Sequence, residues 1–149
     1  MSEHHASIVW SRDGQDFVYE TYSRQHVWRF EGEIDVPGRA APGNIPKTAP
    51  AARGVDPEQA FVAALSSCHM LWFLHLACQR KFVVERYVDD AVGILDGNWI
   101  SRVTLRPVVA FSGEAPSDEE HRALHRKAHE KCYIANSVKT AVLVEPRVG

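Results

Sequence analysis

Short apolar stretches separated by turn residues make up the start of the chain, a pattern that is typical of β-strands. Strands are predicted at residues 7–10 and 17–21, and the Asp-Gly pair between them predicts a hairpin. Apolar and polar residues also alternate over residues 25–34, which predicts a further extended segment. Four prolines and two glycines then fall within residues 37–50 and predict a long loop.

A long helix is predicted after this loop. Asp56 is a good N-cap residue, Pro57 suits the first helical position, and a Gln three residues after Asp56 completes a capping box. The apolar pattern continues to about Lys81. Residues 59–79 carry no Asp, Glu, Lys or Arg, which is long enough to span a bilayer. They include serine, histidine and glutamine and lack flanking anchors, so we interpret them as a buried core helix of a soluble protein.

The chain then returns to strand-like sequence. Residues 83–99 are rich in β-branched and aromatic side chains and are broken by a second hairpin signal, Asp96-Gly97. Residues 100–111 predict one more strand, in which Pro107 favours a bulge or a sheet edge. These segments extend the predicted antiparallel sheet.

A second capping box, Ser117 with Glu120, predicts a helix that runs to about Lys131. A strand at residues 140–144 closes the pattern. The order of strands, long helix, strands, helix and strand predicts an α+β fold in which an antiparallel sheet covers one central apolar helix. With 149 residues and 16.7 kDa, one domain spanning residues 1–149 is expected.

Composition narrows the class of function. The 17 Lys and Arg residues against 19 Asp and Glu give a net charge of −2, and the basic residues are scattered, so a nucleic-acid partner is not expected. Three cysteines do not make a fully paired secreted framework, and the N-terminus lacks a signal-peptide pattern. We therefore expect a cytoplasmic protein with no membrane partner.

Cys68 lies near the middle of the predicted long helix, where a lone cysteine is most often a structural thiol. A catalytic role needs the thiolate, of which only about 3% is present at neutral pH for an ordinary thiol. The helix N-terminus is too distant to help, so a cation, best supplied by an arginine, is required. Cys132 follows 64 residues later and would form a disulfide with Cys68 if the fold brings them together. Cys78, late in the same helix, is interpreted as packing.

The motif around Cys68 has a recognisable pattern. It begins with Asp56 in an Asp-Pro-Glu sequence that places Glu58 ten residues before Cys68. After the second predicted helix comes Cys132, with Asn136 four residues later. This combination resembles the OsmC/Ohr family of thiol peroxidases. The resemblance implies an antiparallel sheet wrapped around the central helix in an intertwined homodimer.

The resemblance also implies an activity. It implies an enzyme of oxidative stress defence that reduces organic hydroperoxides with a peroxidatic Cys68 and a resolving Cys132. A dithiol of the lipoyl type would be the reductant, and neither a cofactor nor a metal would be needed.

By the same resemblance, Glu58 orients an arginine that activates Cys68. Arg12, in an Arg-Asp-Gly turn, and Arg24 are equally favoured for this role. The other arginines before Glu58 are expected to be exposed: Arg29, Arg39 and Arg53. On a straight helix Glu58 and Cys68 lie about 15 Å apart. A homodimer with antiparallel long helices would place Glu58 and the arginine of one subunit beside Cys68 and Cys132 of the other.

Two alternatives stay open. A metal-binding protein could use a stripe of ligands on the second predicted helix: His121, His125, His129 and Cys132. Because His121 and Cys132 would lie about 16 Å apart on a straight helix, such a site needs further ligands, such as His69 or His75. Without them the stripe is a solvated polar face. The other alternative is a non-catalytic OsmC-like protein that binds a ligand.

Overall fold

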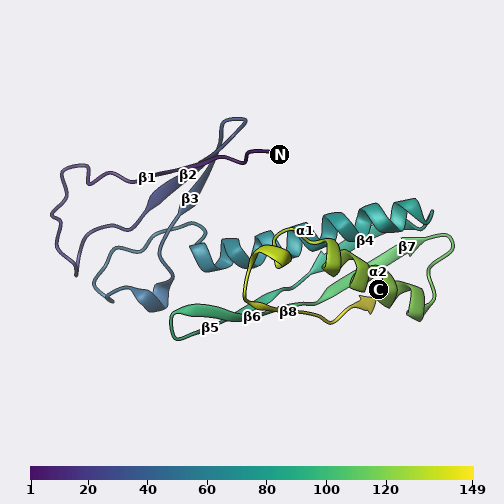
Figure 1. Ribbon diagram of the computed structural model, residues 1–149. Helices are drawn as coiled ribbons and strands as arrows, with labels where there is room; N and C mark the ends of the chain where they lie inside the picture. Colours follow the sequence, from purple (N-terminus) through teal and green to yellow (C-terminus); the bar gives the residue numbers. More distant parts are fainter. The chain divides into compact units, whose positions relative to one another are not determined.

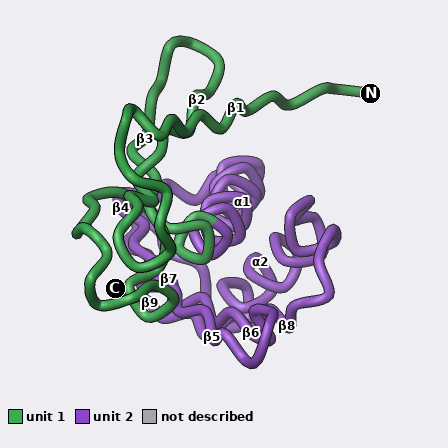
Figure 2. Tube along the Cα trace, turned by 90° about the vertical axis from the view of Figure 1, so that its left-hand side faces the viewer, with its two compact units in different colours: residues 1–60 green, residues 61–149 purple. Residues whose placement is uncertain are grey.

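The computed structural model describes the backbone of residues 1–149 and every side chain except that of Val148. The chain divides into two compact units, residues 1–60 and residues 61–149, which Figure 2 distinguishes by colour. A single domain over the whole chain stays a prediction.

The first unit contains a three-stranded antiparallel sheet in the order β1-β2-β3. Its strands are β1 (Ala6–Val9), β2 (His26–Phe30) and β3 (Ile34–Gly38), followed by the short 3-10 helix η1 (Pro42–Asn44). The predicted segment 25–34 therefore holds β2 and the turn into β3. Most of the predicted loop over residues 37–50 is irregular, as expected.

The strand predicted at residues 17–21 is wrong. The backbone N–H groups of Thr21 and Tyr22 both donate to the carbonyl oxygen of Val18, which makes a turn rather than an extended segment. Strand β1 pairs with β2 instead. The aromatic rings of the segment pack on one another, with 5.0 Å between the centroids of Phe17 and Tyr22 and 5.8 Å between those of Trp10 and Phe17. Within residues 17–21 these ring contacts involve only Phe17, and Phe17, Val18 and Tyr19 stay 68%, 48% and 65% exposed.

Helix α1 (Pro57–Gln79) begins where the capping signal predicts. The N–H of Gln59 donates to Oδ1 of Asp56 at 2.8 Å, and the N–H of Asp56 donates to Oε1 of Gln59 at 3.3 Å. Two orphan donors of the first turn are thereby satisfied. The second carboxylate oxygen of Asp56 lies 3.6 Å from the guanidinium of Arg39.

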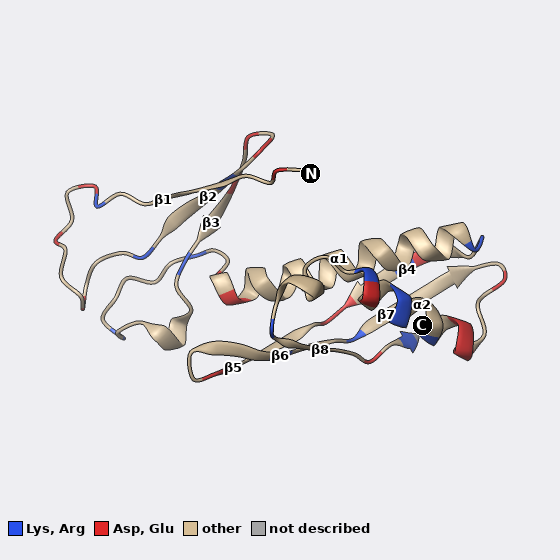
Figure 3. Cartoon of the chain, viewed as in Figure 1, with Lys and Arg blue, Asp and Glu red and all other residues tan. Residues whose placement is uncertain are grey.

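Helix α1 is uncharged between its two ends (Figure 3) but is buried along only one stripe. The buried residues recur every four positions: Leu65, His69, Phe73 and Ala77. Leu71, off this stripe, is 61% exposed. By length and composition α1 is the one helix of the described chain that could cross a membrane, a test that core helices also pass. The second unit thus leaves much of this apolar helix uncovered.

Two three-stranded sheets and a second helix form the second unit with most of α1. The sheets have the orders β4-β7-β9 and β5-β6-β8. The elements are β4 (Val83–Asp89), β5 (Val92–Asp96), β6 (Trp99–Leu105), β7 (Pro107–Ser112), α2 (Asp118–Lys131), the 3-10 helix η2 (Ala135–Ser137), β8 (Ala141–Val144) and β9 (Arg147–Val148).

The single strand predicted at residues 100–111 is two strands, β6 and β7, interrupted at Arg106. Pro107 has no N–H for a ladder, and the N–H of Arg106 donates to the side chain of Asp89 at 2.6 Å instead of to another strand. Besides its antiparallel strand pairs, the second unit has two parallel pairs, β6 with β8 and β7 with β9.

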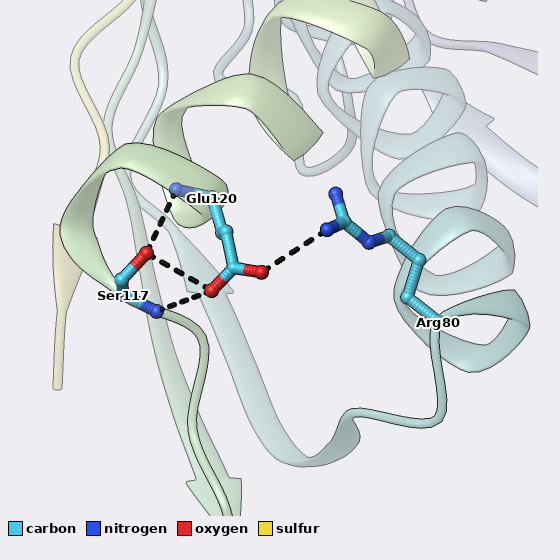
Figure 4. Close-up of polar contacts among 3 residues, drawn as sticks. All are labelled: Arg80, Ser117 and Glu120. Atoms are coloured by element: carbon cyan, nitrogen blue, oxygen red, sulfur yellow. Dashed lines mark hydrogen bonds and ion pairs between the residues drawn. The ribbon is translucent and has the colours of Figure 1, made fainter.

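Both helices pack on these strands, as Figure 1 shows for the second unit. One buried cluster joins Phe73 of α1, Val109 of β7 and Leu124 of α2. The start of α2 has the predicted capping box, in which Ser117 and Glu120 exchange backbone and side-chain hydrogen bonds. The same Glu120 accepts from Arg80, just after α1, at 3.1 Å (Figure 4). The capping box fixes where α2 begins, and the ion pair links that point to the end of α1.

Candidate functional site

Cys68 lies in the middle of α1, one position before the buried His69. Its side chain is half-buried, because it sits at the margin of the stripe that packs on the second unit. It is therefore held by the core and also open to solvent.

Cys132 is the C-cap residue of α2 and is 1% exposed. Its backbone turns to an extended conformation, so the chain leaves the helix at this point. The N–H of Ala135 donates to its sulfur at 3.4 Å, and the N–H of Asn136 donates to its carbonyl oxygen at 3.0 Å. The short helix η2 thus fixes the position of the thiol.

The fold places the thiol of Cys68 close enough to that of Cys132 to act on its pKa. Both cysteines are reduced in this structure. Burial raises the pKa of the Cys132 thiol to about 11; the N–H of Ala135 acts against this, and the contact with Cys68 adds to it. Cys132 is consequently a neutral thiol at neutral pH. Cys78, interpreted from the sequence as packing, is exposed.

The other predicted site residues lie in the first unit. Arg12 donates to the carbonyl oxygen of Gln15 at 3.0 Å. Arg24 donates to two carbonyl oxygens of its own loop, and its guanidinium lies 3.8 Å from the ring centroid of Tyr22. Glu58 stands in the first turn of α1, with one carboxylate oxygen buried and unpartnered among the described residues. The roles of these three residues stay predictions.

Arg39 differs from the expectation that it is exposed. Its side chain is only 24% exposed and forms an ion pair with the buried Asp56. Arg39 and Asp56 are seventeen residues apart, so the sequence does not indicate that they pair. They meet because the end of β3 is hydrogen-bonded to the residues just before α1.

A buried histidine pair joins the two helices of the second unit, and the sequence reasoning missed it. Nε2 of His69 on α1 lies 2.9 Å from Nδ1 of His125 on α2, so one nitrogen donates and the other accepts. The ring of Phe73 stacks on His125 with 4.2 Å between centroids, and the ring of His121 meets His125 edge-on. Burial lowers the pKa of His69 to about 4 and that of His125 to about 3. Both rings are neutral at neutral pH.

The predicted solvated polar face is wrong, and the structure gives the predicted metal face no support. The structure buries His121 and His125 instead of leaving them in solvent, and His125 uses one nitrogen to bind His69. Cys132 neighbours Cys68, and its sulfur accepts the N–H of Ala135. Among the described residues, no group of three or more His, Cys, Asp or Glu side chains is arranged to hold a metal ion. The four-residue spacing of these histidines indicates a face of α2 that is largely buried, not a metal site.

Comparison with known proteins assigns the family. The family model described as OsmC-like protein matches residues 50–147. The chain belongs to the OsmC-like protein family. A structure of an OsmC-like protein of unknown function from Vibrio cholerae is 46% identical, with a TM-score of 0.92 over 99% of this chain and 100% of that one. No curated protein matches the sequence.

More distant OsmC-like structures carry functional names. Organic hydroperoxide resistance protein OhrB of Bacillus subtilis is 17% identical, with a TM-score of 0.62 over 99% of this chain and 98% of that one. A Legionella pneumophila structure named organic hydroperoxide resistance protein OsmC is 18% identical. Its TM-score is 0.65, over 100% of this chain and 98% of that one. At such identities the likeness shows the fold alone, and it confirms the predicted α+β OsmC-like fold.

Proposed function

We propose that this OsmC-like protein is a thiol-dependent peroxidase that reduces organic hydroperoxides. The observation that carries the proposal is that Cys68 and Cys132, two reduced thiols from different helices, are near enough for Cys68 to act on the pKa of Cys132. Neighbouring thiols can form a disulfide when their Cα atoms approach to about 4.4–6.8 Å. Membership of the family, and the names of the distant relatives from Bacillus subtilis and Legionella pneumophila, support the same activity.

The exposures of the two sulfurs divide their roles. Cys68 is half-buried and within reach of a substrate, whereas Cys132 is 1% exposed. A buried thiol whose pKa is about 11 is also a poor nucleophile at neutral pH, because the thiolate is the reactive form. Cys68 is therefore the peroxidatic residue and Cys132 the resolving one.

The reaction proceeds in three balanced steps. The Cys68 thiolate attacks the peroxide: an S–O bond forms, the O–O bond breaks, the sulfur becomes a sulfenic acid, and the alkoxide takes up a proton and leaves as the alcohol. Cys132 then gives up its proton and attacks the sulfenic sulfur as the thiolate; an S–S bond forms, the S–O bond breaks, and the hydroxide leaves with that proton as water. A dithiol reductant of the lipoyl type returns both cysteines to thiols and is itself oxidised to a disulfide.

The thiolate of Cys68 needs a cation, which we propose a second copy of the chain supplies. Helix α1 is apolar around its circumference but buried along one stripe, so it has further apolar surface for a partner helix. Glu58 has a buried carboxylate oxygen without a partner among the described residues, which suits an ion pair with an arginine. In a homodimer, Glu58 and Arg12 or Arg24 of one subunit serve Cys68 of the other.

Three cysteine variants test the proposal. In Cys68→Ser, reduction of cumene hydroperoxide should be lost, because no thiolate is left to attack the peroxide. In Cys132→Ser, Cys68 should be oxidised once, and its sulfenic acid should accumulate without turnover. The matched control Cys78→Ser removes an exposed thiol of the same helix and should turn over like the wild type.

The measurement is stopped-flow oxidation with cumene hydroperoxide beside hydrogen peroxide, followed by mass spectrometry for a disulfide between Cys68 and Cys132. Peroxidase activity that survives in Cys68→Ser would overturn the proposal. A wild-type protein that reacts with neither peroxide would favour the non-catalytic ligand-binding alternative. Turnover that survives in Cys132→Ser without an added monothiol would show that Cys132 is not the resolving residue.

A further inference from the structure

A second site lies between α2 and β8, both labelled in Figure 1, and it includes neither reactive cysteine. It is a pocket of about 300 Å³, at the lower end of the range for small-molecule sites. One wall is polar and comes from a single face of α2: Arg122, His125, Arg126 and His129. The opposite wall is mostly apolar: Val142, Leu143, Val144 and Pro146.

The polar wall is cationic. Neither Arg122 nor Arg126 has an ion-pair partner within 4 Å among the described residues, and no carboxylate side chain lines the pocket there. The two residues are four apart, so their guanidinium groups project from the same side of α2. This wall therefore attracts an anion and offers it planar donors that match a carboxylate.

His125 contributes a rigidly held imidazole ring with one nitrogen that is unpartnered in the described part of the chain. The residue is 2% exposed, yet its Nε2 is buried without a hydrogen-bond partner among the described residues. Its Nδ1 is held by His69, and its ring is stacked on Phe73, so Nε2 is the one free polar atom of a fixed ring that lines the pocket. Buried polar atoms are rarely left unpaired. A group bound in the pocket would supply the partner that Nε2 lacks.

The hydrogen bond between His69 and His125 allows Nε2 of His125 to carry a hydrogen and act as a donor. When Nε2 of His69 donates to Nδ1 of His125, the neutral ring of His125 carries its own hydrogen on Nε2. Nε2 then carries a hydrogen for which the described residues offer no acceptor. His129, which also lines the pocket, has a buried and unpartnered Nδ1 in the described structure. An anion is the ligand that suits the Nε2 hydrogen of His125 together with the two arginines.

We propose that this pocket binds an amphipathic carboxylate, whose charged group contacts Arg122, Arg126 and Nε2 of His125. Its alkyl or aryl body packs on the apolar wall formed by β8 and Pro146. The two walls require both parts of the ligand. An anion without an apolar body would leave the β8 wall exposed to water, and a neutral alcohol would leave the two arginines without a counter-ion. The ligand class is thus set by both walls at once.

Isothermal titration of the full-length, reduced protein with octanoate tests the proposal, with octanol and inorganic phosphate as probes for each half of the ligand. Octanoate should bind more tightly than either. The double variant Arg122→Gln/Arg126→Gln should weaken octanoate binding by about tenfold or more, since charge-assisted hydrogen bonds are lost. The matched control Lys127→Gln removes an exposed cation of the same helix outside the pocket and should change affinity by less than about twofold.

The nitrogen resonances of His125 provide a second readout. Octanoate should shift the Nε2 signal of His125 in the wild type, because that atom gains an acceptor, and octanol should not. Failure of octanoate to bind, equal affinity in the double variant and in Lys127→Gln, or an unshifted Nε2 signal at saturation would each overturn the proposal. Equal binding of phosphate and octanoate would also overturn it, since the apolar wall would then contribute nothing.

Discussion

Mild acid should destabilise this protein through the buried pair His69 and His125. An unfolded histidine has an ordinary pKa of about 6.5. In the folded chain, burial lowers the pKa of His69 to about 4 and that of His125 to about 3. Between these values and pH 6.5 the unfolded chain binds more protons than the folded chain. The free energy of unfolding therefore rises with pH in this window and falls as the pH is lowered.

The size of the effect follows from the two pKa values. Lowering the pH from 7 to 5 protonates most unfolded histidines, while His69 and His125 stay neutral in the folded chain. The loss is about 2 kcal/mol for each ring, or about 4 kcal/mol for the pair. A domain of ordinary stability has roughly 5–15 kcal/mol in total. The pair therefore accounts for a measurable part of the acid sensitivity.

Urea unfolding at fixed protein concentration, at pH 7 and pH 5, measures this loss. In the double variant His69→Leu/His125→Leu both titrating rings are gone, and apolar side chains of similar size fill the site, so its loss should be smaller by about 4 kcal/mol. The matched control His75→Gln removes an exposed histidine of α1 and should keep the wild-type loss. If the wild type and the double variant lose the same stability, the pair does not stay neutral in the folded chain, and the reasoning fails.

Three further predictions concern the helix cap, the ion pair and the shared site. Ser117→Ala should lower the free energy of unfolding by about 1 kcal/mol in urea titrations, because the N-cap acceptor of α2 is lost; an unchanged midpoint would contradict the cap. Arg80→Gln should cost less than about 1 kcal/mol, since its ion pair is half exposed, and a larger loss would mean that it also bears on packing. Refolding Cys68→Ser and Glu58→Ala chains together should restore peroxidase activity that each lacks alone, because one site of a mixed dimer is intact; a lack of complementation, or a peroxide-reducing monomer in light scattering, would refute the shared site.

Helix starts were readable from the sequence because their signals are local. The capping boxes at Asp56 and Ser117 place each donor three residues from its acceptor, and both form as predicted. The hairpin signal at Asp96-Gly97 likewise joins β5 to β6. By contrast, the strand predicted at residues 17–21 is a loop whose apolar side chains stay largely exposed, since a strand forms only where the tertiary structure supplies a pairing partner.

The candidate site shows the same division. The sequence alone indicated that Cys68 and Cys132 would form a disulfide if the fold brought them together, and their reactive roles, implied by the family resemblance, stay predictions. Their meeting depends on how α2 and η2 pack against α1, a contact that spans 64 residues of chain. The histidine spacing on α2 marked a special helix face, but only the packing of His125 against His69 decides that this face is buried and neutral. Local hydrogen bonds are determined by residues a few positions apart, whereas burial and the pKa of a side chain depend on groups that the tertiary structure brings together.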